Sequence, residues 1–180
     1  CKYLSNCPKT WEPITLHHLL THTSGIFNYT DLDTWEKDKV NICREYQPEE
    51  VIAFFRDLPL DYEPGSSWKY SNSGYFLLGV VIEKVSGESY PGFIQKNIFQ
   101  PLGMSESGYD RLGEIVKHRA SGYMWKDSAI NADCWDVSLK FAAGGLYSTV
   151  GDLYKWDQAL YTDQLVSKDS LNKIFTPYVS

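Results

Sequence analysis

Hydrophobic residues are densest between Tyr75 and Val85, where the run carries only two charged side chains, both near its end. A helix that is apolar around most of its circumference is usually buried, because no face of it is suited to water. The pattern therefore predicts a buried helix over about residues 74–85. Ser73 is the expected N-cap, and Ser86-Gly87 is expected to end the helix.

Amphipathic spacing and capping residues predict five further helices. They cover approximately residues 16–22, 48–58, 90–99, 150–160 and 168–175, the first of them ending near Thr23-Ser24-Gly25. The expected N-caps are Thr15, Ser89 and Thr149, the last of which forms a capping box with Asp152. Pro101 is expected to end the helix over 90–99, because proline cannot donate to a continuing helix.

Strand signals are weak by comparison. Residues 28–46 lack clear periodicity and predict a long loop with at most a short helix, and Tyr123–Trp125 predicts one short strand. Gly144-Gly145 indicates a close approach of the backbone to another element or to a ligand. The chain is therefore predicted to be mainly α, with little strand of its own.

The composition fits a folded domain, or a large piece of one. The 180 residues are 43% hydrophobic and 15% aromatic, which argues against disorder. The net charge is −6, and the 17 basic residues are scattered rather than clustered. We therefore expect no nucleic-acid partner and no attraction to an anionic membrane. We also expect no transmembrane segment, because the longest apolar run is far too short to cross a bilayer.

The cysteines and histidines give no clear metal site. The four cysteines, Cys1, Cys7, Cys43 and Cys134, form no Cys-x-x-Cys pair. A Cys1–Cys7 disulfide is one alternative, but cysteines that pack without pairing are favoured. His18 and His22 have a spacing that can bind zinc, yet no glutamate follows the first and no third ligand is near, so structural roles are favoured. No metal and no cofactor are expected.

The stretch from Asp61 to Tyr75 concentrates the polar chemistry of the chain. Pro64-Gly65 marks a turn, and Tyr70–Asn72 then presents a phenol, a hydroxyl and an amide where the buried helix begins. Functional groups are often presented on a loop that a rigid scaffold holds in place. The alternative is an ordinary turn before a helix, since serine and asparagine favour such positions for local hydrogen bonds.

Four phrases, read together, resemble the penicillin-recognising serine hydrolases of the class C β-lactamase and DD-peptidase type. Their order and spacing match that family over nearly the whole chain. The phrases are Ile14–Gly25, Pro64–Asn72, Phe99–Met104 and Gly144–Thr149 with Asp152-Leu153.

The resemblance implies a serine hydrolase that forms an acyl-enzyme and then transfers the acyl group to water or another acceptor. It implies that Tyr70 is the catalytic proton shuttle, that Asn72 binds the substrate carbonyl or holds the catalytic lysine, and that Ser71 is a spacer. A free tyrosine has a pKa of about 10, so a shuttle of this type needs a nearby positive charge.

Two motifs of the family are missing from their expected places. The resemblance places a Ser-x-x-Lys nucleophile before Thr15 and a Lys-Thr-Gly or His-x-Gly strand after Asp152, and the sequence has neither. Ser66–Lys69 and Ser170–Lys173 match Ser-x-x-Lys but lie elsewhere, and we reject both as nucleophiles because such short strings arise by chance. Residues 1–180 are therefore expected to be one helical subdomain, truncated at both ends, of the α/β fold of this family.

The predicted function is that of a central fragment of a β-lactamase-like hydrolase acting on β-lactam, D-Ala peptide or ester substrates. The fragment itself is expected to be inactive because it lacks the nucleophile. Family habit implies an extracytoplasmic location, and the helix faces that would meet the missing sheet are expected to be apolar and to self-associate. Two alternatives remain: a non-catalytic binding or scaffold module of the same fold family, and an independent helical protein with a fully covered core.

Overall fold

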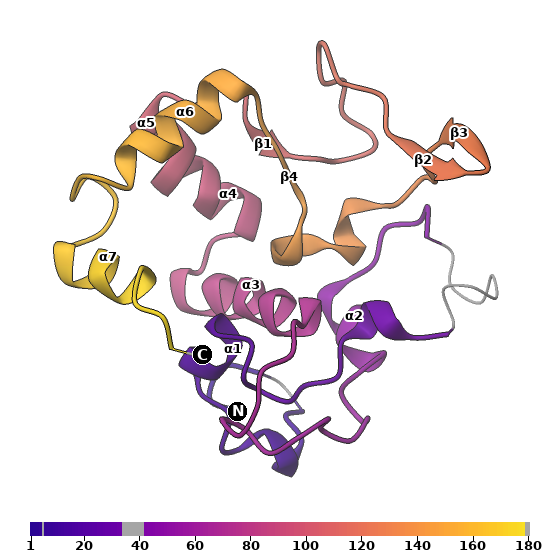
Figure 1. The fold of residues 1–180 in the computed structure, drawn as a ribbon, viewed down its shortest axis with the longest axis vertical. Helices are drawn as coiled ribbons and strands as arrows, with labels where there is room; N and C mark the ends of the chain where they lie inside the picture. The colour runs from indigo at the N-terminus through magenta and orange to yellow at the C-terminus, as the bar shows by residue number, and fades with distance from the viewer. Residues whose placement is uncertain (5, 34–41, 179–180) are drawn as a thin grey trace.

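The computed structural model describes residues 1–4, 6–33 and 42–178. Helix α3, Asn72–Ser86, crosses the middle of the molecule (Figure 1). The prediction of a buried central helix is confirmed, since Phe76 and Leu77 are almost fully buried. Gly87 ends the helix as predicted, in the left-handed conformation that glycine adopts easily.

The predicted start of α3 is wrong by two residues. The N-cap is Ser71, not Ser73. The hydroxyl of Ser73 donates to Phe27 O at 2.6 Å and accepts from Tyr29 N at 2.9 Å. This hydroxyl therefore bonds to residues 27–29 and does not cap the helix.

Besides the 3₁₀ turn η2, Tyr29–Asp31, four elements of the described chain pack directly against α3 and form the core around it. Two of them come from the first third of the chain: α1, Leu16–Leu20, which Thr15 caps as predicted, and α2, Pro48–Ala53. The prediction for α2 was too long, because residues 54–58 continue as turns. The other two are α4, Tyr90–Ile94, and the 3₁₀ turn η5, Phe141–Ala143. The largest fully buried side chains of this core are Tyr29, Phe55, Phe76, Leu77, Leu139 and Val51.

The predicted end of the helix at Pro101 is also wrong. Helix α4 continues through a π-helical turn, η3 (Gln95–Phe99), into α5 (Gln100–Leu102). Pro101 is tolerated because it lies in the first turn of α5, where no intrahelical partner is required of its nitrogen. Gly103, with φ of 64°, ends the run instead.

The last two helices lie close to the residues predicted for them. Helix α6, Val150–Ala159, is capped by Thr149, and α7, Lys168–Ile174, by Ser167. The expected reciprocal bond from Asp152 does not form, because its carboxylate accepts from Glu106 N and Ser107 Oγ. The 3₁₀ turns are η1 (Lys9–Trp11), η2 (Tyr29–Asp31) and η4 (Val137–Leu139).

Strand content is low, as predicted, and limited to two antiparallel pairs in the part of the chain described. Strand β1, Gly108–Tyr109, pairs with β4, Leu146–Tyr147. Strand β2, Tyr123–Lys126, pairs with β3, Ser128–Asn131, in a hairpin that projects from the body (Figure 1). The sequence indicated only β2 of this hairpin. Across the described ranges, no helix has the length and apolarity needed to cross a bilayer.

The cysteine prediction is wrong for one pair. Cys1 and Cys7 form a disulfide, with their Cα atoms 5.2 Å apart, a normal separation for such a bond. Cys43 and Cys134 are exposed and are not in a disulfide.

Candidate functional site at the start of helix α3

The first residues of α3 are fixed to the segment that follows α1. Ser71 is buried, and its hydroxyl donates to Ile26 O at 3.1 Å. The backbone N–H of Asn72 donates to Asn28 Oδ1 at 3.0 Å. Together with the Ser73 bonds to residues 27 and 29, these contacts join two segments more than forty residues apart. Ser71 therefore holds the loop before α3 to the segment that contains Ile26.

The two predicted site residues lie together at the surface. The hydroxyl of Tyr70 donates to Asn72 Oδ1 at 3.0 Å, and the Tyr70 side chain is 51% exposed. The side-chain amide of Asn72 donates to Thr30 Oγ1 at 3.1 Å and to Asn28 Oδ1 at 3.3 Å. The phenol is thus accessible from solvent, while its amide partner is held in a fixed orientation by the opposite segment.

The ring of His22 packs against Tyr70. The sequence alone did not predict His22 as a site residue. Its ring centroid lies 4.6 Å from that of Tyr70 and 4.9 Å from that of Tyr75. Its Nδ1 accepts a hydrogen bond from Ser71 N at 3.2 Å, so this nitrogen carries no proton. Burial lowers the pKa of His22, which favours the same neutral form.

The backbone of His22 also makes hydrogen bonds to the loop before α3. Its φ is 56°, and its carbonyl accepts from Lys69 N at 3.1 Å and from the Tyr62 hydroxyl at 3.0 Å. The sequence signal that could have identified it is its position inside the phrase Ile14–Gly25. The other histidine of the rejected zinc pair, His18, takes part in the Thr15 capping box, so both have the structural roles that were favoured.

Lys69 is paired with acidic side chains. Its ammonium lies 2.7 Å from Asp61 and 3.7 Å from Asp31, and the hydrogen bond with Asp61 raises the pKa of Lys69. Ser66, three residues earlier, lies in a turn and donates its hydroxyl to Glu63 O at 2.6 Å. The Ser66–Lys69 string therefore does not lie on a helix, which agrees with its rejection as a nucleophile motif.

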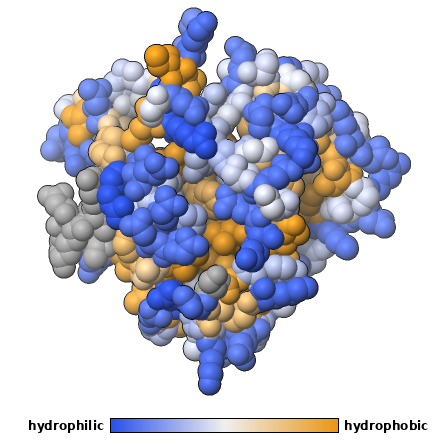
Figure 2. Space-filling view, turned by 180° about the vertical axis from the view of Figure 1, so that it is seen from behind, coloured by the Kyte–Doolittle hydropathy of each residue, from blue (hydrophilic) through white to orange (hydrophobic). Residues whose placement is uncertain are grey.

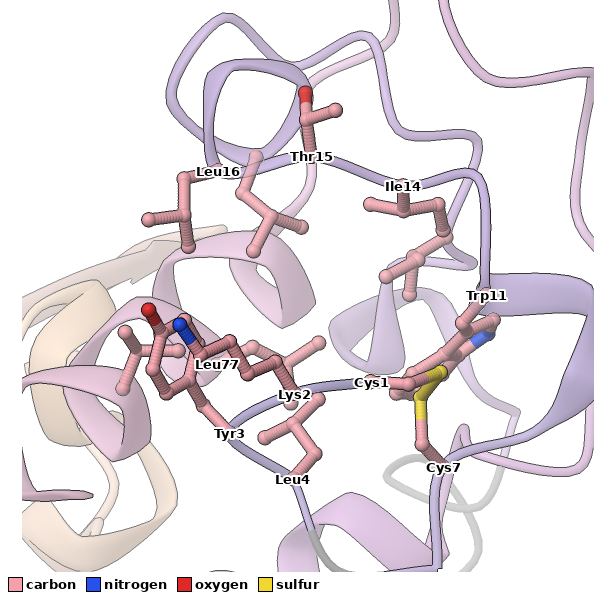
Figure 3. A pocket seen from close by; sticks show the side chains of 13 residues that line it. Cys1, Lys2, Tyr3, Leu4, Cys7, Trp11, Ile14, Thr15, Leu16 and Leu77 are labelled. Carbon is pink, nitrogen blue, oxygen red and sulfur yellow. A yellow bond between two sulfur atoms is a disulfide. The ribbon is translucent and has the colours of Figure 1, made fainter. Parts of the chain in front are cut away.

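Two further features bear on binding. In the described part of the chain, no three His, Cys, Asp or Glu side chains lie close enough to hold a metal ion. An apolar groove of about 220 Å³ runs between the first residues, α1 and α3, with the Cys1–Cys7 disulfide at one end beside Trp11 (Figure 3). It lacks a cluster of convergent polar groups, so the Tyr70–Asn72 pair is the better candidate for chemistry.

The chain is similar to known proteins over nearly its whole length. The family described as Beta-lactamase matches residues 1–179. The chain belongs to the Beta-lactamase family. Penicillin-binding protein 4* of Bacillus subtilis (strain 168) is 34% identical over 184 aligned residues, which cover 93% of this chain and 40% of that protein. The chain thus spans about two fifths of the length of this curated relative.

Solved structures of the family superpose well. A penicillin-binding protein from Bacillus halodurans has a TM-score of 0.84 and 32% identity, covering 99% of this chain and 55% of that one. A D-stereospecific amidohydrolase from Streptomyces sp. has the same TM-score of 0.84 at 28% identity, covering 97% and 56%. The predicted family and the helical part of a β-lactamase/transpeptidase-like fold are thereby confirmed, and the alternative of an independent helical protein unrelated to this family is excluded.

Proposed function

We propose that this chain supplies one wall of the active-site cleft of a β-lactamase-like serine hydrolase, with Tyr70 as proton shuttle and Asn72 as substrate-binding residue. The observation that carries the proposal is the Tyr70–Asn72 pair, which is accessible at the surface and joined at 3.0 Å. In this proposal, residues 1–180 are one helical subdomain of the longer protein.

The chemistry needs a serine from outside these residues. Its oxygen bonds to the substrate carbonyl carbon while its proton passes to the phenolate oxygen of Tyr70. Tyr70 then delivers that proton to the leaving nitrogen or oxygen as the scissile bond breaks, and water reverses the sequence to release the acid. Lys69 forms ion pairs with Asp61 and Asp31. The positive charge that such a shuttle requires would therefore come from the lysine of the nucleophile motif.

Substrates of the whole protein are proposed to be small molecules or peptides with a strained or D-configured amide, or a related ester. The support comes from relatives that are named as penicillin-binding proteins and as a D-stereospecific amidohydrolase. The 180 residues by themselves would be inactive, because loss of the nucleophile from a catalytic unit costs several orders of magnitude even when its other groups remain.

An extracytoplasmic location is part of the proposal. The Cys1–Cys7 disulfide supports it, since such bonds persist mainly in oxidising compartments. The names of the penicillin-binding relatives point the same way.

The test uses the whole protein from which this sequence comes. It should form an acyl adduct with a fluorophosphonate probe and turn over at least one of a chromogenic cephalosporin, a D-Ala-D-Ala peptide and a short-chain ester. Tyr70→Phe should slow acylation by about 10²–10⁴-fold with an unchanged circular dichroism spectrum, because only proton transfer is lost. Tyr123→Phe, in the exposed hairpin, is the control and should acylate normally. Near-normal acylation by Tyr70→Phe would remove Tyr70 from the mechanism.

A further inference from the structure

Two segments that are far apart in the sequence, residues 42–46 and 134–138, are hydrogen-bonded to each other. Asp136 N donates to Ile42 O at 2.7 Å, and Tyr46 N donates to Ser138 Oγ at 2.8 Å. The first segment leads into α2, and the second leads from the β2–β3 hairpin into η4. These two hydrogen bonds lie on either side of Cys43 along the chain, and they hold the two segments next to each other.

Cys43 and Cys134 face each other within this contact. The thiol of Cys43 donates to Cys134 O at 3.2 Å, across 91 residues of sequence. The pKa of Cys43 is raised, chiefly by its hydrogen-bonding interaction with Cys134, and desolvation and the charges of Asp133 and Asp136 act in the same direction. Both cysteines are exposed, so an oxidant can reach them.

We propose that Cys43 and Cys134 form a second disulfide, which joins the segment before α2 to the segment after the hairpin. The first bond of the chain, Cys1–Cys7, shows that the protein carries such cross-links. The oxidant would be a disulfide compound, either a small molecule such as oxidised glutathione or an oxidoreductase in its disulfide form. One thiolate attacks the oxidant and releases one thiol, and the second thiolate then displaces the other, so that two electrons and two protons leave with the oxidant.

The cross-link would brace the scaffold of the candidate site. It closes a loop that contains α3 and both residues of the Tyr70–Asn72 pair. It also lies next to η4, whose Leu139 carbonyl accepts the hydroxyl of Tyr29, the neighbour of Asn28. Closing so long a loop restricts the unfolded chain strongly, so the midpoint of thermal unfolding should rise by about 10 °C.

The experiment compares the reduced 180-residue chain with the same chain after incubation with oxidised glutathione. Titration with a thiol reagent should fall from four thiols to none, and non-reducing peptide mapping should yield one Cys43–Cys134 linked peptide besides the Cys1–Cys7 peptide. In a Cys1→Ser/Cys7→Ser background, the increase in thermal midpoint should remain. Cys43→Ser and Cys134→Ser should each remove it and leave one titratable thiol.

Three outcomes would overturn the proposal. The first is two thiols that stay titratable after oxidation, and the second is glutathione attached separately to both cysteines. The third is a disulfide-linked dimer joined through these residues. Because each readout is a mass or a thiol count, the result is independent of whether Tyr70 has a catalytic role.

Discussion

Among single residues, His22 is expected to make the stability of the candidate site depend on pH. Its neutral ring accepts the Ser71 N–H and stacks against Tyr70, and burial lowers its pKa below that of an exposed histidine, about 6.5. The unfolded chain therefore binds a proton at a higher pH than the folded chain does. The free energy of unfolding should be largest above pH 6.5 and should fall as the pH decreases through that value toward the folded-state pKa.

The measurement is denaturant unfolding between pH 7.5 and 5, with His22→Asn as the comparison. Asparagine tolerates the positive φ of this position and offers Oδ1 in place of Nδ1, but it does not titrate in this range. The variant should lose part of the decrease in stability at low pH, while the other three histidines contribute equally to both proteins. Identical pH profiles would show that His22 does not resist protonation.

Gly25 is the second residue on which the loop depends. Its φ is 72°, and a Cβ added there would lie 2.1 Å from the carbonyl oxygen of Tyr62. Gly25→Ala should therefore destabilise the protein by about 3 kcal/mol, from the strained backbone and from overpacking. Gly87→Ala is the matched control, because it has the same φ of 72° with nothing within 4 Å, and it should cost only about 1 kcal/mol. Equal losses in chemical denaturation would show that the contact with Tyr62 is relaxed.

Among the elements, the junction between α3 and residues 26–29 holds the site together. Ser73 is fully buried and satisfies both Phe27 O and Tyr29 N. Ser73→Ala leaves both backbone groups without their partner, so a loss of about 2–3 kcal/mol is expected. Ser66→Ala removes an exposed hydroxyl from a turn and should change stability by less than about 0.5 kcal/mol. Urea unfolding of the two variants would test this, and a similar effect of both would contradict the assigned role of Ser73.

For the whole molecule, the exposed apolar surface predicts association. Figure 2 shows hydrophobic residues across the middle of one face, between hydrophilic ones, and the groove of Figure 3 adds Leu16, which is 44% exposed. We expect a concentration-dependent increase in sedimentation coefficient at tens of micromolar, since apolar area of this kind favours burial. Leu16→Glu should reduce it, while Ile115→Glu, at a residue that is 97% exposed and outside the groove, should not. Monomers at all concentrations would refute this expectation.

Local patterns predicted much of the helical structure. Thr15, Ser89 and Thr149 cap helices where they were expected to, because a hydroxyl before an apolar repeat meets the N–H groups of the next turn. The prediction at Pro101 was wrong because a π-helical turn and an adjoining helix accommodate the ring. The strand β3 was missed because its residues, Ser128–Asn131, carry little strand preference and are exposed on the hairpin.

The sequence by itself determined the buried central helix and the Tyr-Ser-Asn triplet at its start, because each depends on residues that lie near one another along the chain. It also determined the family, because the order and spacing of four phrases along the chain are visible without a structure. Only the tertiary structure decided that the ring of His22 lies against Tyr70 and that Asn72 donates to Asn28 and Thr30 across more than forty residues. The same is true of the contact between Cys43 and Cys134. Such contacts form when buried surfaces pack together, and no pattern of local spacing encodes which distant segments will meet.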